Sequence, residues 1–562
     1  MFASQLCGLV RKACFDCEMK MATAADLPLK EQLRAQFVGK TLHQVPTPCA
    51  VLDVAKVVVN CERMLEATTR LGLLWRAHTK THKARQPDTA ILFPPPFFSS
   101  CLLSFAGKAL TPCLRPSSST VKPPTNRGGG GHKTTELTRL QVGDNSREVS
   151  LVVSTILEAE NLLPLVQEFQ SKGRNVNVRV LLRSCNLGRL LKTYQVLLGF
   201  PLFPSAVSRL RSFLSSTGPN TLSVLIDHPH QLTSVSALSS NLSPVSVFLK
   251  IDAGYGRSGV VPASSTCADL ICSILSLEAS GACILRGLYS HAGHSYGARQ
   301  NWAAMHYLAD EISGLQIVAR LVREISPAHP LILSFGATPT ATTIQHPSLG
   351  FSGETEGDTA ADDRVHQVQH FLTTLHAQDL KLEVHAGVYP TLDLQQLATH
   401  ARDPSLMTTA DIAITIVAEV ASVYPGRGRN GTAEALITAG NLALGREPVL
   451  DQGSVPGQHY SGWGVLMPWG GAMKNPAPGA EFPRVHEGWE VGRISQEHGI
   501  LTWNGSREDQ ERVPLRVGDK VRVWPNHSCI AGACYDYYLV VDSRNKGRED
   551  EVVDIWPRWR GW

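Results

Sequence analysis

Short apolar runs alternate with helix-like stretches through the first two thirds of this chain. Eight runs end in polar or glycine-containing residues, at 73–80, 150–154, a poorly defined stretch between 175 and 201, 223–227, 245–252, 286–291, 331–335 and 382–385. Strands that alternate with helices are typical of α/β proteins with a parallel sheet. Eight such units predict a (β/α)8 or TIM barrel.

Polar side chains collect at the ends of these runs. They are Lys80, Ser154, Asp227, Asp252, His291, Ser334 and His385. Because the carboxyl ends of barrel strands meet on one face, and barrel enzymes carry out their chemistry there, we expect these residues at a common catalytic rim.

The pattern changes at about residue 412. From there the chain consists of short strand-like stretches and turns rich in glycine, proline and tryptophan. This composition favours a separate β domain. We therefore predict an N-terminal segment over 1–45, the barrel over 46–411 and a C-terminal β-rich domain over 412–562.

Residues 84–132 do not fit the barrel pattern. They contain three consecutive prolines, three serines and four glycines, and they show neither a helical nor a strand period. A structureless stretch of this length inside a compact domain indicates disorder or an insertion foreign to the fold. A lid over the neighbouring Lys80 is the alternative.

Composition narrows the class of protein. The 562 residues carry 53 Lys and Arg against 49 Asp and Glu, a balance that argues against a nucleic-acid binder. Hydrophobic residues make up 43% of the chain, but no run approaches the roughly 20 residues of a membrane span. The 13 cysteines show no repeating spacing, so we expect a reducing compartment and a cytoplasmic protein.

Lys80 is the candidate nucleophile. It lies in a basic cluster with Arg76, His78 and Lys83 directly after an apolar run. A lysine that forms a Schiff base must lose its proton, and neighbouring cations are expected to lower its pKa. A solvated basic loop, or a patch that binds phosphate or nucleic acid, remains the alternative.

His527 and Cys529 form a candidate metal pair. They are two residues apart in a segment that we expect to be a strand, where positions i and i+2 share one face. Imidazole and thiolate are zinc ligands, and two protein ligands leave positions open for water or substrate. A buried cysteine beside an unrelated histidine is the other interpretation.

Taken together, these motifs resemble the D-serine dehydratase and D-threonine aldolase family of pyridoxal phosphate enzymes, which is related to alanine racemase. The resemblance covers about residues 45–545 and is interrupted at 84–132 and near 179–196. The matching segments are Thr47-Pro48, 76–83, 153–155, 252–259, 289–296, 334–339, 385–389, 495–499 and the pair His527 and Cys529.

The resemblance implies a role for each matching residue. Lys80 would carry the cofactor covalently, and His527 and Cys529 would bind Zn²⁺. The residues expected to contact the phosphate or ring of the cofactor are Arg257, Tyr289, Tyr296, Gly336, Thr338, Gly387 and Val388. Relatives commonly have asparagine where this chain has Val388, so only a backbone contact is expected there.

The resemblance also implies a reaction and an assembly. We expect a lyase that converts D-serine to pyruvate and ammonia, in a homodimer. D-threonine aldolase is the first alternative, although the aldolases pair the histidine with aspartate rather than cysteine. A noncatalytic pyridoxal phosphate carrier is the second, although such carriers lack the β domain and the His-x-Cys pair.

Overall fold

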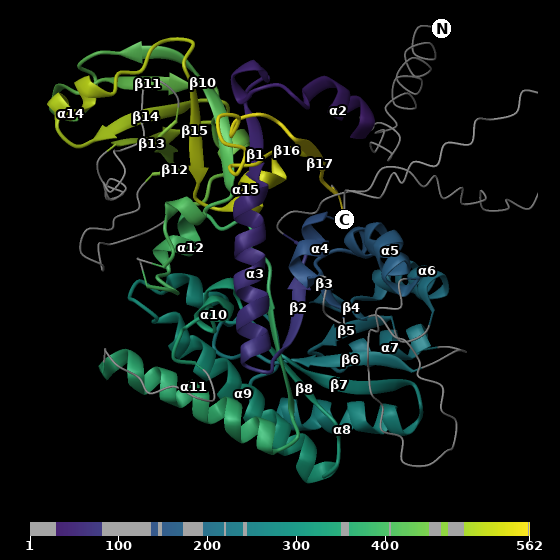
Figure 1. Cartoon of the computed structure of the whole chain (residues 1–562). Helices are drawn as coiled ribbons and strands as arrows, with labels where there is room; N and C mark the ends of the chain where they lie inside the picture. The colour runs from purple at the N-terminus through teal and green to yellow at the C-terminus, as the bar shows by residue number, and fades with distance from the viewer. Residues whose placement is uncertain are drawn as a thin grey trace, which may run out of the picture.

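The computed structural model describes residues 30–80, 136–143, 149–171, 195–218, 221–239, 244–349, 359–403, 406–448, 462–469, 488–559 and 561. The predicted insertion at 84–132 and most of the second interruption near 179–196 lie outside these residues. Figure 1 shows a barrel in blue and teal below a second domain in green and yellow, with helix α3 running along both.

Eight parallel strands close into a barrel in the order β2-β3-β4-β5-β6-β7-β8-β9. They are β2 (Leu74–His78), β3 (Ser150–Val153), β4 (Gln195–Pro201), β5 (Leu222–Ile226), β6 (Val245–Lys250), β7 (Cys283–Tyr289), β8 (Ile332–Phe335) and β9 (Lys381–Ala386). All eight strands predicted from the apolar runs are confirmed. Their nearly continuous burial is the pattern of strands covered on both faces.

Helices alternate with the barrel strands, and most of them cover the outside of the sheet, while α12 lies toward the second domain (Figure 1). They are α3 (Val54–Arg70), α4 (Glu136–Val142), α5 (Ile156–Ser171), α6 (Val207–Thr217), α7 (Gln231–Ser239), α8 (Ser265–Ala279), α9 (Ala304–Ile325), α10 (Thr338–Thr343), α11 (Thr359–Ala377) and α12 (Leu394–Ala398). The side chains of Asp53, Ser264 and Asp393 accept backbone N–H bonds at the starts of α3, α8 and α12. These caps satisfy donors that a helix start leaves without partners.

A charged pair lies inside the barrel beside its apolar filling. Arg76 and Glu383 have exposed fractions of 0% and 1%, and the Nε of Arg76 lies 2.6 Å from a Glu383 carboxylate oxygen. Arg76 also donates to the side chain of Gln195 at 3.0 Å, and its guanidinium lies over the ring of Phe248. The Arg76 charge is therefore neutralised within the barrel, away from Lys80.

The second domain is an antiparallel barrel with an extension. Pairing runs through β10, β11, β14, β13, β12 and β15 and returns to β10. These strands are β10 (Ile414–Tyr424), β11 (Glu434–Ile437), β12 (Gly464–Met467), β13 (Gly488–Ile494), β14 (Gly499–Asn504) and β15 (Lys520–Pro525). The predicted combination of a TIM barrel with a β domain is confirmed.

The first described part of the chain joins this second domain. Strand β1 (Cys49–Asp53) pairs antiparallel with β10 and parallel with β16 (Tyr537–Val541), which pairs with β17 (Asp554–Pro557). Helix α2 (Lys30–Phe37) packs on β17, where Arg34 contacts Asp554. Residues 46–53 were expected to belong to the barrel domain, but β1 pairs with strands of the second domain. The apolar character of a strand does not reveal which sheet it joins.

Three short helices and several 3-10 turns complete the described chain. The helices are α13 (Asn441–Leu444), α14 (Arg507–Arg512) and α15 (Ser528–Ala533). The 3-10 turns are η4 (Gly293–Gly297) and those at Leu42–Gln44, Pro204–Ala206, Thr409–Asp411 and Arg429–Gly431. Each described helix is too short or too polar to cross a lipid bilayer.

Candidate active site

The predicted rim residues lie where the barrel meets the second domain. Lys80 follows β2, Arg257 follows β6, Tyr296 lies in η4 after β7, and the segments at 336–338 and 387–388 follow β8 and β9. Helix α15, which belongs to the second domain, contributes Cys529. Figure 1 shows α12 and α15 in the region between the two domains.

Lys80 has both acidic groups and a cation near it, and this cation is not one of the three expected from the sequence. Burial is the largest influence and lowers the pKa of its amine, as does Arg257, but Tyr296, Cys529 and Glu158 together raise it, so that its pKa lies above the ordinary value. Of the three expected cations, Arg76 is paired with Glu383, His78 is hydrogen-bonded to Ser154 at 3.0 Å, and Lys83 lies outside the described residues. The predicted lowering is therefore wrong, and any reactivity of Lys80 comes from its position.

A second lysine lies at the same end of the barrel. Lys250 ends β6, is 4% exposed, and places its Nζ 5.0 Å from the ring centre of Tyr289. Its pKa is lowered to about 8, mainly by burial and in smaller part by Arg257, while Glu311 opposes this lowering. Sequence reasoning passed over Lys250 because it reads as the polar end of an apolar strand.

Two glycine segments approach the Lys80 region closely. A Cβ on Gly387 would lie 3.4 Å from the Cε of Lys80 and 3.3 Å from the backbone oxygen of His78. Gly336 has a φ of +139°, and a Cβ there would lie 2.3 Å from the backbone oxygen of His385. Both positions favour glycine for its small size, and Gly336 also for its conformation.

Thr338 joins these two segments. Its hydroxyl accepts the backbone N–H of Val388 at 3.1 Å. Burial raises the pKa of Tyr296, whereas Lys80 and a hydrogen bond with Thr338 lower it. Tyr296, Thr338 and Val388 therefore belong to one connected group beside Lys80.

Three aromatic rings stack between β7 and β9. Tyr289 lies on His385 with 4.1 Å between ring centres, and His291 lies 6.2 Å beyond His385. Burial, with the nearby lysines, lowers the pKa of both histidines well below the ordinary value. The Nδ1 of His385 bonds to Ser334 at 3.1 Å, whereas its buried Nε2 has no hydrogen-bond partner in the described chain.

A buried glutamate from α9 fixes the neighbouring loops. Glu311 accepts the backbone N–H of Ala292 at 2.8 Å and of Gly336 at 3.3 Å, and the hydroxyl of Thr340 at 3.0 Å. Burial raises its pKa, and these hydrogen bonds lower it in part. Sequence reasoning missed Glu311, because an acidic residue within a helix is typical of an exposed face.

The predicted metal pair does not lie in a strand. Strand β15 ends at Pro525, His527 caps α15, and Cys529 lies in the first turn of that helix. The expectation that both share a strand face is therefore wrong, because the short apolar segment turns into a helix. Both residues still lie close enough to Lys80 to be coupled electrostatically to it.

In the described residues, His527 and Cys529 are the two side chains that this candidate metal site offers as ligands. In the described ranges, no group of three or more histidine, cysteine, aspartate or glutamate side chains could hold a metal ion. The Nδ1 of His527 contacts the carboxylate of Glu447. This contact leaves the other ring nitrogen, Nε2, as the ligand atom that His527 could offer.

Asp393 connects the segment after β9 to α15. One carboxylate oxygen accepts the N–H of Ser528 at 2.8 Å, and the other accepts the N–H of Gln396 at 2.9 Å. Thr391 donates to the Ser528 hydroxyl at 3.1 Å. The Gly387 segment and the pair His527 and Cys529 are thus held in register across the domain junction.

Replacing Asp393 with asparagine is expected to weaken this junction. An amide has one acceptor oxygen and would present its NH₂ group to a buried N–H donor. We expect a loss of about 1–3 kcal/mol in the free energy of unfolding, measured by urea titration. The exposed Asp269→Asn serves as the control, and equal stability of the two variants would contradict the assigned role of Asp393.

Comparison with known proteins identifies the family. A profile described as "Putative serine dehydratase domain" matches residues 413–541, and one described as "Alanine racemase, N-terminal domain" matches residues 208–351. The chain is 33% identical to a D-serine dehydratase of Schizosaccharomyces pombe over 95% of this chain and 96% of that protein. This chain belongs to the D-serine dehydratase family.

Solved structures agree with this family in fold. D-threo-3-hydroxyaspartate dehydratase, as a cysteine-to-alanine variant in the metal-free form, superposes with a TM-score of 0.59 at 20% identity, covering 93% of this chain and 100% of that chain. D-threonine aldolase from Filomicrobium marinum gives a TM-score of 0.53 at 16% identity, covering 92% and 97%. The family fold thus extends over both domains of this chain.

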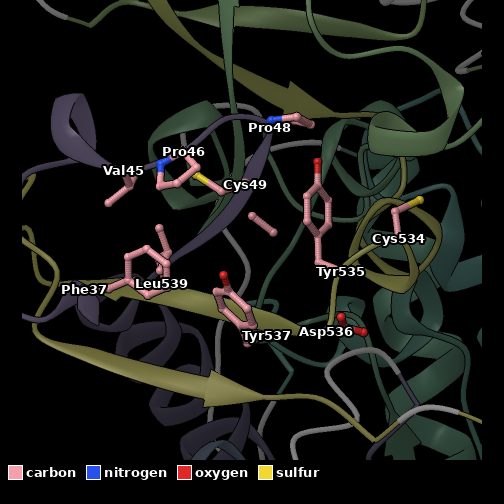
Figure 2. A pocket seen from close by; sticks show the side chains of 11 residues that line it. Phe37, Val45, Pro46, Pro48, Cys49, Cys534, Tyr535, Asp536, Tyr537 and Leu539 are labelled. Atoms are coloured by element: carbon pink, nitrogen blue, oxygen red, sulfur yellow. The ribbon is translucent and has the colours of Figure 1, made fainter. Parts of the chain in front are cut away.

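A cavity of about 220 Å³ lies elsewhere in this family member, between α2, β1 and β16. Figure 2 shows Phe37, Tyr537 and Leu539 on one side of it, with Tyr535 farther along. None of the predicted site residues lines it, and its lining offers no cluster of charged groups. The rim around Lys80 is therefore the better candidate for the active site.

Proposed function

We propose that the chain is a pyridoxal phosphate- and zinc-dependent lyase that converts D-serine to pyruvate and ammonia. One observation carries the proposal: Lys80 lies where the glycine segment after β9 meets the His527 and Cys529 pair of the second domain. This arrangement would allow the Lys80 amine, the glycine-containing loop after β9 and the candidate metal pair to act on the same substrate molecule.

The residues at the rim fit pyridoxal phosphate. Gly387 keeps free a space beside Lys80 that a side chain would fill, and Gly336 allows the backbone after β8 to pack against that of His385. The buried Nε2 of His385, which has no hydrogen-bond partner in the described chain, offers a polar contact to a ring or substrate. Lys80 would attach the cofactor, with Gly387, Val388 and Thr338 at the phosphate and Arg257, Tyr289 and Tyr296 around it.

His527 and Cys529 fit a zinc ion. The contact of His527 with Glu447 orients the imidazole as carboxylates orient metal-bound histidines. A soft thiolate selects zinc over magnesium or manganese. In D-threo-3-hydroxyaspartate dehydratase, the cysteine replaced in the metal-free structure lies two positions after a histidine that was replaced in another structure. That spacing equals the one between His527 and Cys529.

The chain's own groups divide the work of the reaction. Pyridoxal phosphate supplies an electron sink for the substrate α-carbon, and zinc supplies a Lewis acid for the β-hydroxyl. Once the substrate amine has displaced it from the cofactor, the Nζ of Lys80 would be a free neutral amine that can take the α-proton. His527 and Cys529 hold the metal, and the Thr338 and Asp393 hydrogen bonds keep both sets of groups in register.

Product analysis separates this proposal from its alternatives. The purified protein, loaded with pyridoxal phosphate and zinc, is incubated with D-serine, L-serine and D-threonine. We expect pyruvate and ammonia from D-serine and neither from L-serine. Acetaldehyde from D-threonine as the main product would indicate the aldolase, and no product from any substrate would indicate a carrier.

Removal of the metal is expected to remove this activity. Treatment with a chelator, His527→Ala and Cys529→Ala should each lower pyruvate formation by about 100-fold, because losing even a group that only supports a metal ligand costs about 10- to 100-fold and losing a ligand should cost no less. The exposed residues His366 and Cys272 provide matched controls as alanine variants. Full activity after complete zinc removal would rule out the metal's role.

A further inference from the structure

Glu447 reaches the candidate metal pair from a part of the chain that no sequence motif singled out. It follows α13, eighty residues before His527, and its carboxylate contacts the Nδ1 of His527. The Glu447 side chain is 44% exposed and the His527 side chain is 18% exposed. The contact therefore forms at the solvent-facing edge of the candidate metal site, with the His527 ring on its more buried side.

The backbone around Glu447 is tied to the same segment. The side-chain amide of Asn526, which directly precedes His527, donates to the backbone oxygen of Glu447 at 3.0 Å. The same amide donates to the backbone oxygen of Gly462 at 2.9 Å. Asn526 is 3% exposed, so these bonds are shielded from water. Glu447 is thus held beside His527 by its main chain as well as by its carboxylate.

A carboxylate that accepts a hydrogen bond from one ring nitrogen of a histidine determines whether the other nitrogen has a lone pair free to bind a metal. With its proton on Nδ1 and donated to a carboxylate, a neutral imidazole presents the Nε2 lone pair, and its basicity toward a metal rises. We propose that Glu447 is a positioning residue that holds His527 in the form whose Nε2 binds zinc. This inference rests on the proposed zinc site at His527 and Cys529.

The test measures zinc affinity directly. Zinc is titrated into the cofactor-loaded protein in competition with a chromophoric chelator, without any substrate. Glu447→Ala is expected to weaken zinc binding by about 10- to 100-fold. Glu447→Gln, whose amide oxygen still accepts the Nδ1 proton but carries no charge, should lose less. Glu160→Ala is the matched control, because Glu160 is 40% exposed and its carboxylate pairs with Arg209 rather than with His527.

Each outcome separates the positioning role from the zinc site itself. If His527→Ala abolishes zinc binding but Glu447→Ala keeps the wild-type affinity, the role of Glu447 is overturned and the zinc site stands. If the wild-type protein binds no zinc that depends on His527, both ideas fail. Should Glu447→Ala not fold, Glu447→Gln decides: a weakened affinity at an unchanged melting temperature supports the role, and a wild-type affinity overturns it.

Discussion

Replacing Lys80 with alanine is expected to remove both the bound cofactor and the activity. Lys80 is the group proposed to attach the cofactor and to take the α-proton, so one substitution removes two functions. We expect pyruvate formation from D-serine to fall by at least about 10³-fold, within the range for loss of a general base. The visible absorbance of the cofactor bound to the protein should fall with it.

Two other lysine variants make this test specific. Lys381→Ala removes an exposed lysine at the start of β9, the opposite end of the barrel, and should leave loading and activity unchanged. Lys250→Ala removes the rival lysine at the rim and should keep covalent loading. A Lys80→Ala protein that still forms pyruvate at a similar rate would contradict the assignment.

Neutralising Glu383 is expected to give the largest loss of stability. Glu383→Gln would leave the Arg76 guanidinium, which is 0% exposed, without a counter-charge inside the barrel. Breaking a buried pair in this way costs about 3–5 kcal/mol of the free energy of unfolding. Urea titration should show this loss, because the other hydrogen bonds of Arg76 go to neutral groups, the backbone oxygen of Leu151 and the side chain of Gln195.

Removing both charges tests the physical reason. Arg76→Met combined with Glu383→Leu leaves no unpaired charge and should recover much of the lost stability. Glu511→Gln, in the exposed pair with Arg507, should change stability by less than about 1 kcal/mol. A Glu383→Gln variant as stable as Glu511→Gln would show that the barrel solvates Arg76 in another way.

The barrel could be predicted from the sequence because its signal is local. Each of the eight strands is an apolar run that ends in polar residues, and each is buried where the pattern indicated. Strand β1 has the same apolar character but pairs with β10 and β16. Its partners lie hundreds of residues away, and no local pattern distinguishes a strand of one sheet from a strand of the other.

The residue types of the site could be predicted better than their surroundings. Lys80, Tyr296, Thr338 and Val388, which lie in separate motifs of the sequence, are close neighbours in the structure, and their roles at the cofactor stay predictions. The charge around Lys80 was predicted wrongly, because the barrel interior pairs Arg76 with Glu383. Arg76 is only four residues from Lys80 in the sequence, but its side chain points into the barrel interior.

Groups that support the site were invisible in the sequence. Glu311, Asp393 and Glu447 each bond to at least one residue nineteen or more positions away, and none lies in a distinctive motif. The helix at Ser528–Ala533 was also missed, because six residues are too few to separate a strand from a helix by periodicity. Such features follow from tertiary packing.

Reductive trapping of the cofactor tests the central claim most directly. The protein loaded with pyridoxal phosphate is reduced with borohydride, digested, and mapped by peptide mass spectrometry. We predict the phosphopyridoxyl group on Lys80. Its attachment to Lys250, the other buried lysine at the rim, or to no lysine at all, would contradict the account.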